Sequence, residues 1–141
     1  MRPCTTIAAL VLWALPLLPA RAESDWPSYN RTLTSERFSP LAGIDAASAP
    51  RLHVVCSYDT GQMTAFQSGL VQRDGALFAT TEHDTFSIDP DTCRENWRVR
   101  EEFRDSYLGA QRGVAVEDGR VFRGGADGLV HAYDEQTGRR L

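Results

Sequence analysis

The chain has 141 residues, the length of one ordinary domain, and its 42% hydrophobic and 24% charged residues exclude a disordered tail and a membrane bundle. Its formal net charge of −4 argues against a nucleic-acid partner, because proteins that bind the phosphate backbone are normally basic.

Residues 1–22 predict a secretory signal peptide. Arg2 supplies the positive start, an apolar run covers residues 7–18, and Ala20-Arg21-Ala22 has the small-x-small pattern of a cleavage site. The apolar run is too short to cross a bilayer. No second hydrophobic segment follows it, so we expect no membrane span. We expect cleavage after Ala22 and a periplasmic mature protein; the alternative is an uncleaved N-terminal anchor.

Two cysteines lie beyond the predicted signal peptide, Cys56 and Cys93. In an oxidising compartment they could pair in a disulfide. Two buried free thiols are the alternative that the sequence leaves open. The cysteine spacing matches neither Cys-x-x-Cys nor Cys-x-x-Cys-His, so the chain carries no zinc-ribbon or covalent haem signal.

The sequence repeats itself from Gly69 onward. Residues 69–78 are similar to residues 113–122, and residues 86–94 are similar to residues 131–139, offsets of 44 and 45. A period of this size is typical of four-stranded propeller blades.

Turn and strand signals agree with this period. Asp74-Gly75 and Asp118-Gly119 favour tight hairpins. Strands are predicted at 76–80, 85–88 and 129–133, where β-forming residues gather. The one helical candidate is a short turn over residues 46–49, capped by Asp45. We therefore predict an all-β fold of four-stranded antiparallel blades.

The second half of each repeat carries a sharper pattern, small-x-Asp-x-x-Thr-Gly-x-x-x-Trp. The positions concerned are Asp89, Thr92 and Trp97 in the first copy and Asp134, Thr137 and Gly138 in the second. The pattern resembles the tryptophan-docking repeat of the pyrroloquinoline-quinone (PQQ) dehydrogenase propellers. There the Asp and Thr fix a turn, and the Trp of one blade packs against the next.

The resemblance implies a division of the chain. After the signal peptide, residues 23–68 form an N-terminal segment that includes the ring-closing strand, in which Cys56 stands where many members have Trp. Residues 69–141 are propeller repeats: a first blade at 69–111 and an incomplete second blade at 112–141. The second copy ends one residue before its docking Trp. We therefore expect a fragment, about two blades of a ring of up to about eight.

The resemblance implies one cofactor contact, Arg112, because the family carries an Arg-Gly pair whose Arg reaches the edge of PQQ. Two positions depart from the family. Phe66 replaces a Glu found in many members, and Ser106-Tyr107 replaces the adjacent cysteine pair of alcohol-oxidising members. The family's catalytic Asp and calcium ligands come from later blades. No catalytic or metal-binding residue is therefore expected here.

The resulting hypothesis is the N-terminal fragment of a periplasmic PQQ-dependent dehydrogenase, inactive by itself. In complete form it would oxidise a small-molecule alcohol or sugar with PQQ and calcium, which enter through the resemblance alone, and it requires the remaining blades. The alternative is a non-catalytic propeller that acts as a binding module or an outer-membrane assembly scaffold. Arg112 and the family-like entry segment from Trp26 to Leu41 favour the enzyme, whereas Phe66 and the missing cysteine pair favour the scaffold.

Overall fold

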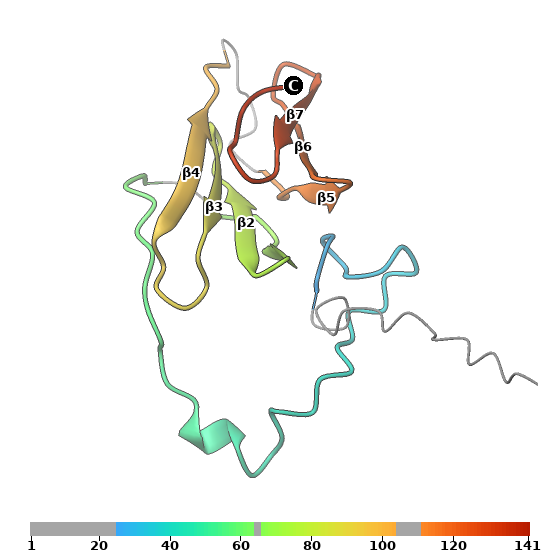
Figure 1. The fold of residues 1–141 in the computed structure, drawn as a ribbon, viewed down its shortest axis with the longest axis vertical. Helices are drawn as coiled ribbons and strands as arrows, with labels where there is room; N and C mark the ends of the chain where they lie inside the picture. Colours follow the sequence, from blue (N-terminus) through green and yellow to red (C-terminus); the bar gives the residue numbers. More distant parts are fainter. Residues whose placement is uncertain (1–24, 64–65, 104–110) are drawn as a thin grey trace, which may run out of the picture.

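The described part of the chain contains two antiparallel sheets (Figure 1). The structure, a computed structural model, describes residues 25–63, 66–103 and 111–141. The first sheet has the order β1-β2-β3-β4, and the second has the order β5-β6-β7. The strands are β1 (Val71–Arg73), β2 (Ala76–Thr80), β3 (Asp84–Ile88), β4 (Glu95–Arg100), β5 (Ala115–Glu117), β6 (Arg120–Gly124) and β7 (Val130–Asp134). The all-β prediction is confirmed.

Two-residue turns set the register of both inner hairpins. Arg73 pairs with Ala76 in the first sheet, and Glu117 pairs with Arg120 in the second. The dipeptides between these pairs have positive φ at both residues: 48° and 80° at Asp74-Gly75, and 49° and 71° at Asp118-Gly119. This backbone matches the right-handed twist of the strands, which is why Asp-Gly is favoured there.

The second sheet continues toward a fourth strand. Tyr133 forms a bridge with Arg140, and the Leu141 N–H donates to the carbonyl of Ala132 at 2.9 Å. The pair Ile88 and Glu95 occupies the same place in the first sheet, 45 residues earlier. The two sheets are therefore successive copies of one unit.

The main core lies between the two sheets. Its buried members are Val71, Phe78, Trp97, Val114, Val116, Val121 and Tyr133. Residues from both sheets share this cluster, so each sheet buries one face against the other, as neighbouring propeller blades do. A smaller cluster on the first sheet contains Ala79, Phe86 and Ile88, with Tyr58 packed against it.

The segment before β1 has little regular structure (Figure 1). Trp26 forms a bridge with Gln72 in β1. The predicted helical turn is displaced: Asp45 accepts bonds from the N–H groups of Ala47 and Ser48, and the 3-10 turn η1 follows at Ala49–Arg51. Pro50 lies inside η1, because a proline tolerates the first helical positions, where no N–H is needed.

Residues 52–62 form no ladder with a described strand, so the ring-closing strand stays a prediction. They are nevertheless attached to the first sheet. The Tyr58 hydroxyl donates to Glu95 at 2.6 Å, and Arg98 donates to the Thr60 carbonyl at 3.1 Å. No helix among the described residues is long and apolar enough to cross a membrane.

Candidate functional site: docking turns and the end of the sheets at Arg112

Asp89 and Thr92 lie in the turn between β3 and β4. One carboxylate oxygen of Asp89 accepts bonds from the Thr92 hydroxyl and N–H, both at 2.8 Å, and from the Asp91 N–H at 3.0 Å. The Thr92 hydroxyl, followed by its N–H, holds the pKa of Asp89 below its ordinary value, because both bonds favour the charged form. The turn therefore depends on an ionised carboxylate.

Asp134 and Thr137 build the same turn in the second copy. Asp134 accepts from the Thr137 hydroxyl at 2.7 Å, from the Thr137 N–H at 2.9 Å and from the Gln136 N–H at 3.2 Å. The Thr137 hydroxyl and N–H again lower the pKa of the carboxyl. The repeat is thus conserved between the two copies in atomic contacts as well as in sequence.

Trp97 connects the first sheet to the second turn. Its side chain is 8% exposed, and its indole N–H donates to the Glu135 carbonyl at 2.9 Å. The ring lies over Gly138, where an added Cβ would come within 2.7 Å of a ring carbon. Gly138 also has φ of 69°, a backbone conformation that favours glycine. Trp97 therefore occupies the position that a docking tryptophan requires.

Arg112 lies at the end of the sheets where β1 and β5 begin. Its carbonyl accepts from the Gly69 N–H at 3.1 Å, which joins the starts of the two inner strands. Gly113 makes this approach possible, because it has φ of 105° and an added Cβ would lie 2.6 Å from the Gly69 carbonyl oxygen. The side chain of Arg112 is exposed, and within the described part of the chain it has no hydrogen bond or ion pair.

Phe66 lies near an apolar hollow of about 360 Å³ on the outer face of the first sheet. Tyr58, Leu70, Phe86 and Ile88 line this hollow with it. Phe66 is 49% exposed. Ser106 and Tyr107 lie outside the described residues.

A buried cation that the sequence analysis missed, Arg123, joins the two sheets at this same end. It is 1% exposed, and its guanidinium donates to four oxygen atoms of the first sheet. The acceptors are the carbonyls of Thr81 (3.3 Å), Glu82 (2.8 Å) and His83 (3.2 Å) and the hydroxyl of Thr85 (3.0 Å). Burial lowers the pKa of Arg123, and nearby acidic groups oppose this.

The alternation of β6 contained a signal for this residue. Val121 and Arg123 are both buried, whereas Arg120 and Gly124 are exposed. Side chains two positions apart in a strand share a face, so Arg123 follows the core-facing Val121. A period-two reading of β6 would have placed the arginine on the inter-sheet face.

A second polar network lies beside Arg123. Arg140 donates to Nδ1 of the buried His131 at 3.0 Å, and because arginine can only donate, the other ring nitrogen carries the proton. That nitrogen donates to Asp127 at 3.0 Å. Glu101 accepts from the Tyr133 hydroxyl at 2.9 Å. Burial and this bond raise the pKa of Tyr133 to about 12.

None of these groups forms a metal centre. In residues 25–63, 66–103 and 111–141 there is no cluster of three or more His, Cys, Asp or Glu side chains that could hold a metal ion.

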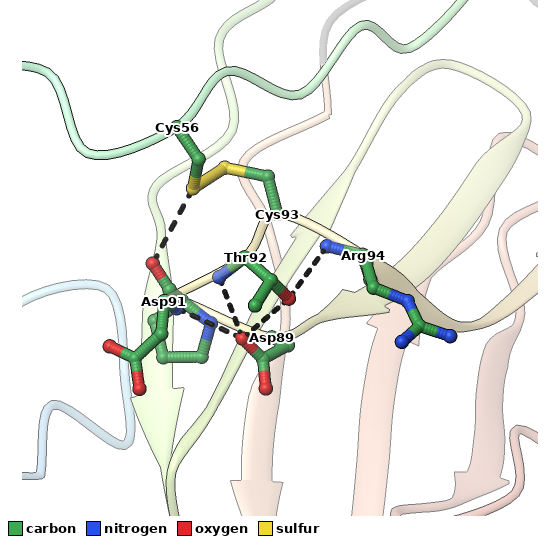
Figure 2. Close-up of a disulfide and its surroundings, with 7 residues drawn as sticks. Cys56, Asp89, Asp91, Thr92, Cys93 and Arg94 are labelled. Atoms are coloured by element: carbon green, nitrogen blue, oxygen red, sulfur yellow. Dashed lines mark hydrogen bonds between the residues drawn. A yellow bond between two sulfur atoms is a disulfide. The ribbon is translucent and has the colours of Figure 1, made fainter.

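In the structure, Cys56 and Cys93 form a disulfide with Cα atoms 5.7 Å apart (Figure 2). Cys93 takes the place in the first turn that Gly138 has in the second, and it has a similar positive φ of 55°. The disulfide attaches the segment before β1 to the turn that Asp89 and Thr92 build.

A family model described as "PQQ: Glucose/ethanol/alcohol dehydrogenase, beta-propeller domain" matches residues 26–141. The quinohemoprotein alcohol dehydrogenase ADH IIB of Pseudomonas putida is 29% identical over 99% of this chain and 21% of its own length. The 1-butanol dehydrogenase (cytochrome c) of Thauera butanivorans is 29% identical over 85% of this chain and 18% of its own length. The chain thus spans about a fifth of the length of these relatives.

Solved structures show the same relationship. The quinohemoprotein alcohol dehydrogenase from Comamonas testosteroni superposes with a TM-score of 0.79 and 27% identity, covering 86% of this chain and 19% of that chain. A europium-containing methanol dehydrogenase superposes with a TM-score of 0.72 at 20% identity, which shows the shared fold; the match covers 83% of this chain and 22% of that chain.

Proposed function

Since the chain belongs to the PQQ family of glucose, ethanol and alcohol dehydrogenase β-propeller domains, we propose that it forms the opening blades of an exported PQQ-dependent dehydrogenase that oxidises alcohols or sugars. The relatives named above are alcohol dehydrogenases, and one further relative is a quinoprotein glucose dehydrogenase of Acinetobacter calcoaceticus.

The observation that supports this proposal is the placement of Arg112. Backbone contacts between Gly69, Arg112 and Gly113 hold it where the two inner strands start, and its guanidinium stays exposed there. PQQ carries carboxylates and carbonyl oxygens, and a guanidinium binds such groups with charge-assisted, forked hydrogen bonds. An arginine that has no hydrogen bond or ion pair with the described residues fits that ligand.

In this proposal PQQ, when bound, accepts two electrons and thereby serves as the oxidant of the substrate. Arg112 binds and orients the cofactor's acidic edge. Arg123 on β6 bonds Thr85 and the β2–β3 turn of the first sheet, and so holds the two sheets together at the end where Arg112 lies. The catalytic base and the calcium ligands come from the remaining blades.

Arg112→Ala tests the proposed contact in the intact protein that carries these blades. Loss of a hydrogen bond to a charged group costs about 1.5–3 kcal/mol, so the Kd for PQQ should rise by roughly 10- to 100-fold. The matched control is Arg120→Ala, an exposed arginine on β6 at the opposite end of the strand. PQQ binding, measured by equilibrium dialysis, should be unchanged in the control. Unchanged binding in Arg112→Ala would refute the assigned role.

Export is part of the proposal. The signal-peptide pattern supports cleavage after Ala22, so the intact mass of protein from the periplasmic fraction should correspond to a chain that starts at Glu23. A mass that includes Met1, found in the cytosolic fraction, would contradict it.

A further inference from the structure

At two places in this molecule a side chain from an earlier part of the chain lies on an Asp-x-x-Thr turn, and we call these places joints. The first joint is Cys56 on the turn of residues 89–93, and the second is Trp97 on the turn of residues 134–138. At the second joint, Trp97 lies over Gly138 and donates to the Glu135 carbonyl at 2.9 Å. At the first joint, Cys56 is bonded to Cys93, and its sulfur lies 3.6 Å from the Pro90 carbonyl oxygen (Figure 2). The two joints therefore use corresponding atoms of the turn.

The correspondence holds residue by residue at the 45-residue offset. Pro90 and Cys93 are the counterparts of Glu135 and Gly138. The turns also share their backbone bonds: the Cys93 N–H donates to the Asp89 carbonyl at 2.9 Å, as the Gly138 N–H donates to that of Asp134 at 2.9 Å. Cys56 thus lies on the first turn where Trp97 lies on the second.

A docked tryptophan ring and a side chain at the turn position beneath it cannot fit together for steric reasons. A Cβ at Gly138 would lie 2.7–3.1 Å from ring carbons of Trp97, so a docked ring requires glycine beneath it. Cys93 does carry a Cβ, at the same positive-φ position. An indole at position 56 could not dock over it without displacement. The cysteine at position 93 is therefore incompatible with a docked tryptophan at position 56 but compatible with the cysteine found there.

One interatomic distance is nearly the same in the Trp97–Gly138 contact and in a disulfide. The Cγ of Trp97, the atom that a cysteine Sγ would replace, lies 3.1 Å from the Cβ position at Gly138. Across any disulfide, one Sγ lies about 3 Å from the other residue's Cβ, which follows from its standard bond lengths and angles. The spacing between Trp97 and Gly138 thus matches the spacing across a disulfide.

We infer that the Cys56–Cys93 disulfide is a covalent replacement for the tryptophan-on-glycine docking contact, and that it makes the attachment of residues 52–62 to the first blade dependent on redox conditions. Closing the joint transfers two electrons and two protons from the two thiols to a disulfide donor, which becomes a dithiol. Opening it with dithiothreitol reverses the transfer: both cysteines regain a hydrogen and the reagent becomes a cyclic disulfide.

Little apolar contact would hold residues 52–56 after reduction, since Leu52, Val54 and Val55 are 62%, 79% and 69% exposed. The remaining attachments in the described structure lie in the half of the segment beyond Cys56. They include the hydrogen bonds of Tyr58 to Glu95 and of Arg98 to Thr60, and the packing of the Tyr58 ring against Phe86. Reduction should therefore release residues 52–56 first.

The experiment exchanges one joint for the other in the intact, exported protein. Limited proteolysis of residues 52–56 should be slow in the oxidised wild type and about tenfold faster after dithiothreitol, a factor equivalent to about 1.4 kcal/mol of protection. The double variant Cys56→Trp/Cys93→Gly should be protected with or without the reductant. Cys56→Trp alone and Cys93→Gly alone should both be cleaved rapidly. A double variant no better protected than the single variants would overturn the inference.

The reciprocal exchange gives a readout that does not depend on protection. Trp97→Cys/Gly138→Cys should form a disulfide across the second joint, found by peptide mapping without reduction. The control Trp97→Cys/Gly128→Cys has the same first cysteine and places the second in another positive-φ turn, where no such contact exists. Failure of the first pair to cross-link above the control would likewise overturn the inference.

Discussion

One position of each docking turn, occupied by Gly138 in the second turn and by Cys93 in the first, determines which side chain can pack on that turn. Gly138 and Cys93 both have positive φ, 69° and 55°. A non-glycine residue in such a conformation costs of order 1 kcal/mol or more and persists only when its surroundings fix it. At Cys93 the disulfide to Cys56 and the bonds of the Asp89 turn supply that restraint.

Gly138→Ala should therefore destabilise the intact protein through two effects, the positive φ and the clash with Trp97. Gly128→Ala is the matched control, since its φ is 78° and nothing lies within 4 Å of an added Cβ. We expect the control to lose about 1 kcal/mol. Gly138→Ala should lower the free energy of unfolding by about 1–3 kcal/mol more than the control does, which is the usual cost of overpacking. Urea unfolding measures both, and equal losses would show that the ring does not need the space.

At the scale of the element, the docking turns tie stability to pH. Asp89 and Asp134 have lowered pKa values in the folded chain, through Thr92 and Thr137. A lowered folded pKa adds stability above the unfolded pKa, about 3.9 for aspartate. That stability is lost as the pH falls through the folded value.

Removing the threonine hydroxyl should change how the stability depends on pH in the acid range. In Thr137→Val the Asp134 carboxyl loses its 2.7 Å bond, so its pKa should return toward the ordinary value. The stability of the variant relative to the wild type should be lower near neutral pH, and the difference should shrink below about pH 4. Unfolding midpoints measured from pH 7 to pH 3 test this. A difference that stays constant over the whole range would argue against an ionised carboxylate in the turn.

Arg123 acts between elements, since β6 carries it and its bonds are accepted by the β2–β3 turn and by Thr85 of β3. Arg123→Leu should lower the free energy of unfolding by about 3 kcal/mol or more, because it leaves several buried carbonyl groups unpaired. Arg120→Leu, an exposed arginine on the same strand, should change it by less than about 0.5 kcal/mol. Chemical denaturation of both variants provides the comparison, and similar small losses would contradict the assigned bridging role.

At the scale of the whole molecule, both sheets pack on each other and leave apolar side chains on outer surfaces. Leu129, Val130 and Leu141 are 58%, 75% and 53% exposed around the second sheet, and Leu70 is 52% exposed beside the first. Propeller blades bury such surfaces against the next blade. The fold therefore suits a member of a larger ring.

We predict that residues 23–141 expressed alone will not give a stable monomer and will not oxidise alcohols when PQQ and calcium are added. One exposed arginine, Arg112, cannot replace the rest of a cofactor site, and uncovered sheet faces favour self-association. Circular dichroism melting and a dye-linked oxidation assay are the measurements. A sharp transition in a monomer, or turnover above a blank without protein, would contradict this prediction, whereas adding further blades should restore folding.

The local features of this protein could be predicted from its sequence. The strands predicted at 76–80, 85–88 and 129–133 agree within one residue with β2, β3 and β7. Asp-Gly hairpins and Asp-x-x-Thr turns were predictable because their bonds join residues only two or three positions apart. The helical turn at 46–49 was misplaced, since a capping aspartate can also close a turn that is not helical.

Which distant residues meet depends on how the two sheets pack together. The sequence left Cys56 and Cys93 open between a disulfide and free thiols, because a sequence separation of 37 puts no limit on the distance between them. The alternation of β6 places Arg123 on the same face as Val121, but only the packing of the second sheet on the first brings it to the carbonyls of the β2–β3 turn. Whether a side chain is buried, and which group it pairs with, depends on the residues that pack over it. Those residues lie in another part of the chain, so the sequence of a single strand does not reveal them.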